Sequence, residues 1–217
     1  MAELADAADL KSAGAILVGS SPSPGTRYTM GILVAVLSYI VGGIPTAYLA
    51  GRMKGKDIRQ IGDGNVGAGN AYRELGAFTG ISVFAFDVAK GFIIITIARH
   101  SVGTDSIMLW AGIAAVLGHS FSIFLRFRGG RGEAVAIGAL IALLGWPAVI
   151  CTMVGILSLA IFKNVIVASA SGFVLLPLVC WAFGVPSLLI LYSIFLPVQV
   201  GIIHFLRVHS KRILHLA

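Results

Sequence analysis

Charged residues are scarce in this chain. Asp, Glu, Lys and Arg make up 12% of its 217 residues, hydrophobic residues make up 58%, and the mean hydropathy is +0.96. Soluble domains average about 25% charged residues, so this composition excludes an ordinary soluble fold. A membrane-spanning helix needs about 20 mainly apolar residues. Five stretches meet that requirement: residues 30–51, 79–98, 106–125, 165–183 and 186–206.

Cysteine is also scarce, since only Cys151 and Cys180 are present and both lie inside apolar stretches. We expect buried free thiols there rather than a disulfide. Cysteine and histidine do not recur at zinc-site spacing, so the sequence predicts no metal and no cofactor. The first residues are acidic, unlike the basic start of a signal peptide. We expect residues 1–29 to be extramembrane, with a short amphipathic helix over 1–13 and a flexible linker over 19–26.

The apolar stretch at residues 134–162 is too long for one untilted span and is interrupted at Gly145-Trp146-Pro147. Because proline lacks a backbone donor, we expect two short helices that enter and leave on the same face. With the five long stretches, this gives about seven helical segments. The predicted fold is an all-α, polytopic membrane bundle over residues 30–206.

Positive charge is concentrated outside the apolar stretches, and the formal net charge is +7. Three clusters hold most of it: Arg52, Lys54, Lys56, Arg59 and Arg73; Arg126, Arg128 and Arg131; and Arg207, Lys211 and Arg212 in a basic tail over 207–217. The positive-inside rule puts all three in the cytoplasm, which the paired short helices allow if the N-terminus is outside. We therefore predict a multi-pass protein of the inner (plasma) membrane. Its cations suit the membrane edge, and no nucleic-acid partner is expected.

A polar island, residues 61–70, separates two apolar stretches and reads Ile-Gly-Asp-Gly-Asn-Val-Gly-Ala-Gly-Asn. Its glycines permit left-handed backbone, and its asparagines supply donors and acceptors. Arg59 and Arg73 flank it. The pattern indicates an anion site at a membrane surface, built from backbone amides and arginines. The simpler alternative is a turn between two helices.

A second motif, Gly129-Gly130-Arg131-Gly132, precedes the next helix. Free N–H groups at a helix N-terminus attract anions, so this loop is a second candidate anion site. His119, near the end of the preceding span, suits either a general base or a hydrogen-bonded structural histidine. Asp87 and Lys90 lie three residues apart inside another span, where they can form an ion pair. Charges within the membrane indicate a functional site, but we favour a structural ion pair that steadies the bundle near its cytoplasmic end.

Together these motifs resemble the PlsY family, the acyl-phosphate:glycerol-3-phosphate acyltransferases. The resemblance covers residues 38–49, the island with its two arginines, residues 86–91 and residues 118–138. It implies a polytopic enzyme that transfers an acyl group from acyl phosphate, not from acyl-CoA, to glycerol 3-phosphate and yields lysophosphatidic acid. The implied partners are these two substrates and membrane lipids.

The resemblance also implies roles for individual residues. His119 and Asn70 are implied to be catalytic, with His119 orienting or deprotonating the acceptor hydroxyl. The implied phosphate-binding set is Arg59, Gly64, Asn65, Gly67, Arg73, Gly129, Gly130 and Arg131. Lys90 and His204 are implied to have secondary roles.

The chain departs from the family pattern where phosphate would bind. Asp63 replaces a serine, Glu133 replaces a valine, and the family's asparagine after His204 is missing. Family hydroxyls are also lost at Gly43, Gly69, Val135 and Ala136. Fewer hydroxyl donors and added carboxylates weaken anion binding, so we expect weak acyl transfer. The alternative is a catalytically degenerate protein of the same fold that serves as a subunit of a larger membrane complex, with other membrane-protein subunits as partners.

Overall fold

The computed structural model describes residues 24–101 and 104–214, and the secondary structure within them is helical. The elements are α2 (Pro24–Gly42), α3 (Thr46–Met53), α4 (Ala68–Leu75), α5 (Ala77–Ser101), α6 (Asp105–Ser120), the 3-10 helix η1 (Ile123–Leu125), α7 (Glu133–Leu144), α8 (Trp146–Phe162), α9 (Val165–Ala182) and α10 (Ser187–Leu214). The predicted all-α class is confirmed. The amphipathic helix expected over 1–13 and most of the expected linker lie outside the described residues.

Five helical stretches of the described chain are long and apolar enough to cross a membrane. They are Tyr28–Met53, Ala77–Ser101, Asp105–Leu125, Val165–Ala182 and Ser187–Val208. These stretches confirm the five predicted spans, and the shorter α7 and α8 complete the seven expected segments. The break between α7 and α8 falls at Gly145, as predicted. Pro147 lies in the first turn of α8, where a missing N–H costs no helical hydrogen bond.

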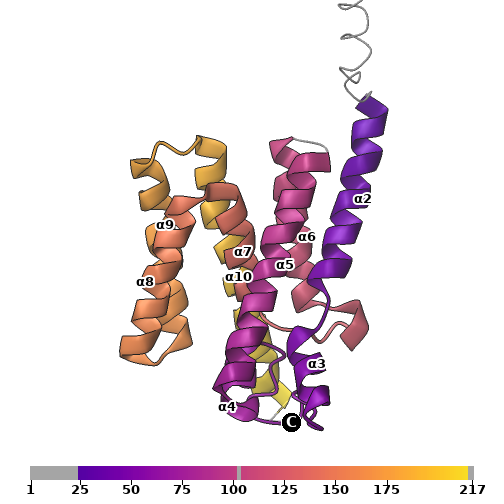
Figure 1. Ribbon diagram of the computed structural model, residues 1–217, viewed down its shortest axis with the longest axis vertical. Helices are drawn as coiled ribbons and strands as arrows, with labels where there is room; N and C mark the ends of the chain where they lie inside the picture. The colour runs from indigo at the N-terminus through magenta and orange to yellow at the C-terminus, as the bar shows by residue number, and fades with distance from the viewer. Residues whose placement is uncertain (1–23, 102–103, 215–217) are drawn as a thin grey trace, which may run out of the picture.

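The connections gather at two ends of the bundle (Figure 1). Residues 43–76 and 121–132, the α8–α9 connection and the C-terminal end of α10 lie together at one end, which we call the motif end. Helices α7 and α8 form a hairpin that leaves this end and returns to it. The predicted sharing of one end by both motif loops and the C-terminus is therefore confirmed.

Close helix crossings hold the centre of the bundle together. A Cβ on Gly91 of α5 would collide with the Val135 carbonyl of α7, and a Cβ on Gly138 of α7 would collide with the Val88 carbonyl of α5. Because both positions lack a side chain, the two helices pack backbone to backbone. The apolar core around them includes Ile95, Leu140 and Leu196, and the structure leaves Cys151 and Cys180 as buried free thiols, as predicted.

The first span is broken between α2 and α3, and side chains from distant elements donate hydrogen bonds to the main-chain carbonyls at the break. Lys90 donates to the Ile44 carbonyl at 2.8 Å, and Ser122 donates to the Gly43 carbonyl at 2.6 Å. Lys90 also pairs with Asp87 at 2.8 Å, and Thr46 donates to Asp87 at 2.6 Å. A broken helix is tolerated in lipid only where protein groups replace the lost backbone hydrogen bonds. The predicted structural ion pair is thus present, and it fastens α5 to this break.

Candidate active site

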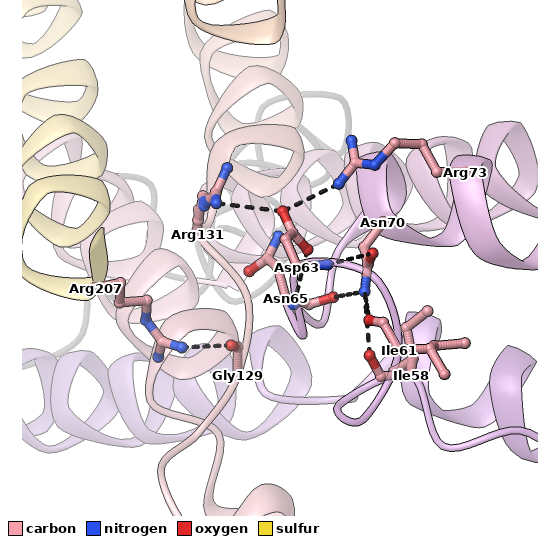
Figure 2. A network of polar contacts seen from close by, with 9 residues as sticks. All are labelled: Ile58, Ile61, Asp63, Asn65, Asn70, Arg73, Gly129, Arg131 and Arg207. Carbon is pink, nitrogen blue, oxygen red and sulfur yellow. Dashed lines mark hydrogen bonds and ion pairs between the residues drawn. The ribbon is translucent and has the colours of Figure 1, made fainter. Parts of the chain in front are cut away.

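The two glycine-rich loops meet at the motif end, as predicted. Asp63 Oδ2 of the island lies 3.0 Å from Arg73 Nη2 and 3.5 Å from Arg131 Nη2 of the second loop (Figure 2). The carboxylate therefore bridges two guanidinium groups that come from elements far apart in the sequence. All three side chains keep part of their surface exposed, so the cluster opens outward from the protein.

Asn70, in the first turn of α4, holds the island in shape. Its side chain is 1% exposed and donates to the carbonyls of Ile58, Ile61 and Asn65, each at 3.1 Å. Its Oδ1 accepts the backbone N–H of Asp63 at 3.3 Å. The predicted hydrogen bond from this asparagine to main-chain carbonyls is confirmed (Figure 2). Such contacts belong to a residue that positions the loop.

Most of the amides expected to bind an anion are used inside the loop. Gly64 N–H donates to the Ile61 carbonyl at 3.0 Å, and Asn65 N–H donates to Asp63 Oδ1 at 3.0 Å. Gly67 is the N-cap of α4. Asp63 N–H is also engaged, so three amides of the island have acceptors within the loop, and the guanidinium groups of Arg73 and Arg131 lie beside it.

The second loop shows the same pattern. Gly129 N–H donates to the Ser120 carbonyl at 3.0 Å, and Gly130 N–H donates to the His119 carbonyl at 3.1 Å. Both amides therefore have acceptors within the protein, and the phosphate-binding roles implied for Gly129 and Gly130 stay predictions. A Cβ on Gly130 would collide with His119 Nε2 and would lie 2.6 Å from the Val66 carbonyl oxygen. Glycine is required here for close approach, which carries the next residue, Arg131, to the island.

His119 lies between this loop and the buried charges of α5. It is 7% exposed, and its Nδ1 lies 3.8 Å from Asp87 Oδ1, beyond hydrogen-bond length. Its Nε2 edge faces Gly130. The ring is thus held by packing at the inner wall of the loop junction. Asp87, the acidic residue near the ring, forms its ion pair with Lys90.

Arg59 forms a separate ion pair. Its Nε and Nη2 donate to the two carboxylate oxygens of Asp57 at 2.9 and 2.6 Å, and its guanidinium lies 4.7 Å from the centroid of the Tyr48 ring. These donated hydrogen bonds lower the pKa of Asp57 to about 2. Asp57 consequently stays ionised at any physiological pH, and Arg59 already has an anionic partner.

Arg207 is the site residue that the sequence analysis missed. It was assigned to a basic tail, but α10 continues through Leu214, so most of that tail is helical. Arg207 donates to the Gly129 carbonyl at 2.6 Å (Figure 2). It also donates to the Ser120 carbonyl, and its guanidinium lies 5.7 Å from the centroid of the Phe121 ring. His204 and Arg207 are half-buried and lie three residues apart, so they share one face of α10. This spacing is the feature of the sequence that indicates that Arg207 lies near the site.

Glu133, the first residue of α7, accepts a hydrogen bond from Ser169 of α9. Of the two carboxylates expected to face the site, only Asp63 makes an arginine pair among the ion pairs of the described residues. Glu133 instead connects the start of α7 to α9 through this hydrogen bond.

Comparison with known proteins identifies this arrangement. The sequence profile of the family described as Glycerol-3-phosphate acyltransferase matches residues 32–216. The chain belongs to this family. The predicted PlsY resemblance is therefore confirmed.

Members of the glycerol-3-phosphate acyltransferase family align with this chain over most of its length. Glycerol-3-phosphate acyltransferase 4 of Dehalococcoides mccartyi is 45% identical over 185 residues, which are 85% of this chain and 100% of that protein. The glycerol-3-phosphate acyltransferase of Endomicrobium trichonymphae is 33% identical over 184 residues, covering 84% and 92% of the two chains.

Crystal structures of PlsY (YgiH), an integral membrane glycerol 3-phosphate acyltransferase, share the fold. The glycerol 3-phosphate form has a TM-score of 0.75 and 32% identity, and the match covers 86% of this chain and 92% of that one. The lysophosphatidic acid form has a TM-score of 0.72 at the same identity and coverage. The chain is thus a multi-pass membrane protein of the acyltransferase family, and these matches do not favour the alternative of a non-catalytic subunit.

Proposed function

We propose that this protein transfers an acyl group from acyl phosphate to glycerol 3-phosphate and releases lysophosphatidic acid and inorganic phosphate. The observation that carries the proposal is the junction of the two loops, which brings Arg73 and Arg131 together on one carboxylate. Both substrates are phosphates, and guanidinium groups bind phosphate oxygens through charge-assisted, often bidentate, hydrogen bonds. Family membership supplies the substrate class.

The protein itself contributes little covalent chemistry to this reaction. The acceptor hydroxyl oxygen forms a bond to the acyl carbon, the bond from that carbon to the phosphate oxygen breaks, and the hydroxyl proton is released. Because acyl phosphate is already activated, positioning and charge stabilisation are the main contributions. Arg73 and Arg131 hold phosphate charge, and His119, on the inner wall of the junction, orients the hydroxyl or accepts its proton.

A groove beside the junction suits the acyl chain. Its volume is about 430 Å³, and it is lined by Phe121, Phe127, Arg128, Ile203, Leu206 and Arg207. The apolar walls match a hydrocarbon chain, and the two arginines match the phosphate at its end. Arg207 links the groove to the second loop through the Gly129 carbonyl.

The motif end is proposed to face the cytoplasm of a cell with this protein in its inner membrane. The three cationic clusters support this orientation, because short cytoplasmic segments carry the excess of lysine and arginine. Residues 1–29 would then begin on the opposite side, as an extramembrane segment.

The test is acyl transfer by the purified full chain in lipid vesicles. We expect labelled glycerol 3-phosphate to become lysophosphatidic acid when acyl phosphate is the donor, and no product with acyl-CoA. Arg131→Ala and His119→Ala should each lower turnover at least tenfold while the protein remains folded by size-exclusion chromatography. Absence of product from the unaltered chain with acyl phosphate would contradict the proposal.

A further inference from the structure

The cluster at the loop junction already contains its own anion. Asp63 contacts both Arg73 and Arg131, and the side chains of these three residues are 37%, 49% and 27% exposed. The two guanidinium groups that the proposed function assigns to phosphate are therefore neutralised in part by a carboxylate of the same chain (Figure 2). An incoming phosphate has to compete with that carboxylate for the same donors.

The fold directs Asp63 to this place. Its backbone N–H donates to Asn70 Oδ1, its side-chain Oδ1 accepts the Asn65 N–H, and its Oδ2 is left facing the arginines. Asn70 is itself fixed by three hydrogen bonds to main-chain carbonyls. The carboxylate is thus pre-positioned by a buried network, although its outer face is open to solvent.

We propose that Asp63 acts as an internal counter-ion that competes with substrate phosphate for the arginines Arg73 and Arg131. This inference rests on the proposed function, since it takes phosphate as the ligand of Arg73 and Arg131. Without substrate, the Asp63 carboxylate holds the two guanidinium groups together and competes with other anions for them. Substrate phosphate displaces the carboxylate by rotation of an exposed side chain, so Asp63 weakens substrate binding without taking part in acyl transfer.

The sharpest variant is Asp63→Asn, which removes the charge but keeps an Oδ1 acceptor for the Asn65 N–H. We expect its affinity for inorganic phosphate, measured by calorimetry in detergent, to rise about tenfold, because two partly exposed ion pairs no longer compete. The KM for glycerol 3-phosphate or acyl phosphate should fall by a similar factor with kcat unchanged. A merely structural role would lower kcat or the unfolding temperature instead.

Asp105→Asn is the matched control, because it removes one exposed negative charge at the start of α6, far from the motif end. It should leave phosphate affinity unchanged. Asp63→Ser provides a second variant with the same expected gain. Equal or weaker phosphate binding in both Asp63 variants would overturn the inference. Tighter phosphate binding without acyl transfer by any of the proteins would support the inference while contradicting the proposed function.

Discussion

At the scale of single residues, the polar groups of the motif end do two different jobs. The Asn70 side chain and the amides of Gly64, Gly129 and Gly130 donate hydrogen bonds that fix the shape of the loops. The side chains of Arg73 and Arg131 remain partly exposed at the surface. A sequence reports that donors are present but not what they bind. The sequence therefore predicted both loops and their meeting, but it did not predict that the amides of Gly64, Gly129 and Gly130 donate to main-chain carbonyls.

Gly130→Ala tests the close approach of the second loop to His119. The added methyl group would collide with the His119 ring and the Val66 carbonyl, so we expect a loss of about 1–3 kcal/mol of stability and most of the activity. Thermal unfolding in detergent and the acyl-transfer assay measure the two effects. Gly201→Ala is the control, since nothing lies within 4 Å of that position. Equal stability of the two variants would contradict the contact.

Arg207→Lys tests the guanidinium that reaches the Ser120 and Gly129 carbonyls. Lysine brings a single ammonium group where the guanidinium reaches two carbonyls, so at least one of the two hydrogen bonds that Arg207 donates is lost or weakened. We expect a loss of about 1–3 kcal/mol of stability. Arg52→Lys, at an exposed position of α3, should change stability by less than about 0.5 kcal/mol. A thermal shift no larger than that of the control would show that Arg207 has no such role.

At the scale of elements, the long helices and the α7–α8 pair were predictable, whereas the eight-residue helices α3 and α4 were not. Runs of about 20 apolar residues identify spans by composition alone. Helices α3 and α4 have eight residues each, too few for intrinsic stability. α4 depends on contacts from elsewhere in the chain: Lys54 and Lys56 donate to the carbonyls of Leu75 and Glu74 at its C-terminal end.

The attachment of α5 to the α2–α3 break can be measured with Asp87→Asn. Asp87 and Lys90 are 1% and 8% exposed, so removing the carboxylate leaves a buried ammonium group without its counter-ion. We expect a loss of about 3–5 kcal/mol in the free energy of unfolding. Denaturant unfolding in micelles provides the measurement, and Asp105→Asn serves again as the exposed control.

A double variant distinguishes an isolated ion pair from one that also holds α5 against the α2–α3 break. Asp87→Leu with Lys90→Met would restore stability if the two charges interacted only with each other. We expect recovery to be incomplete, because Thr46 and the Ile44 carbonyl also lose their partners. Full recovery would contradict the role assigned to Lys90.

At the scale of the whole molecule, charge and proline placement together predicted the topology. Six plain spans, with residues 134–162 crossing once, would put the second loop and the C-terminal end of α10 on opposite sides. The α7–α8 hairpin adds the one reversal that brings them together. What the sequence could not supply is the packing between distant segments, such as Arg207 on the second loop, because that depends on how the helices are placed side by side.

Labelling of single cysteines in whole cells checks the topology. With Cys151 and Cys180 replaced by alanine, a membrane-impermeant maleimide should label Ser101→Cys and should not label Gln60→Cys or Lys163→Cys until the membrane is permeabilised. All three positions are exposed, and only residue 101 lies at the end opposite the motif loops. Labelling of residues 60 and 163 from opposite sides would contradict the hairpin.

The break in the first span also has a consequence for biosynthesis. The carbonyls of Ile44 and Gly43 obtain their side-chain donors from residues 46 and 79 positions later, respectively. While the ribosome is still adding the residues of this span, neither Lys90 nor Ser122 has been synthesised. Until α5 and then the segment after α6 arrive, the Gly43 carbonyl lacks its side-chain donor and the Ile44 carbonyl has the Thr46 N–H, 3.1 Å away, but not Lys90. The contacts at this break are therefore completed only after Ser122 has been made, although the broken span precedes α5 and α6 in the chain.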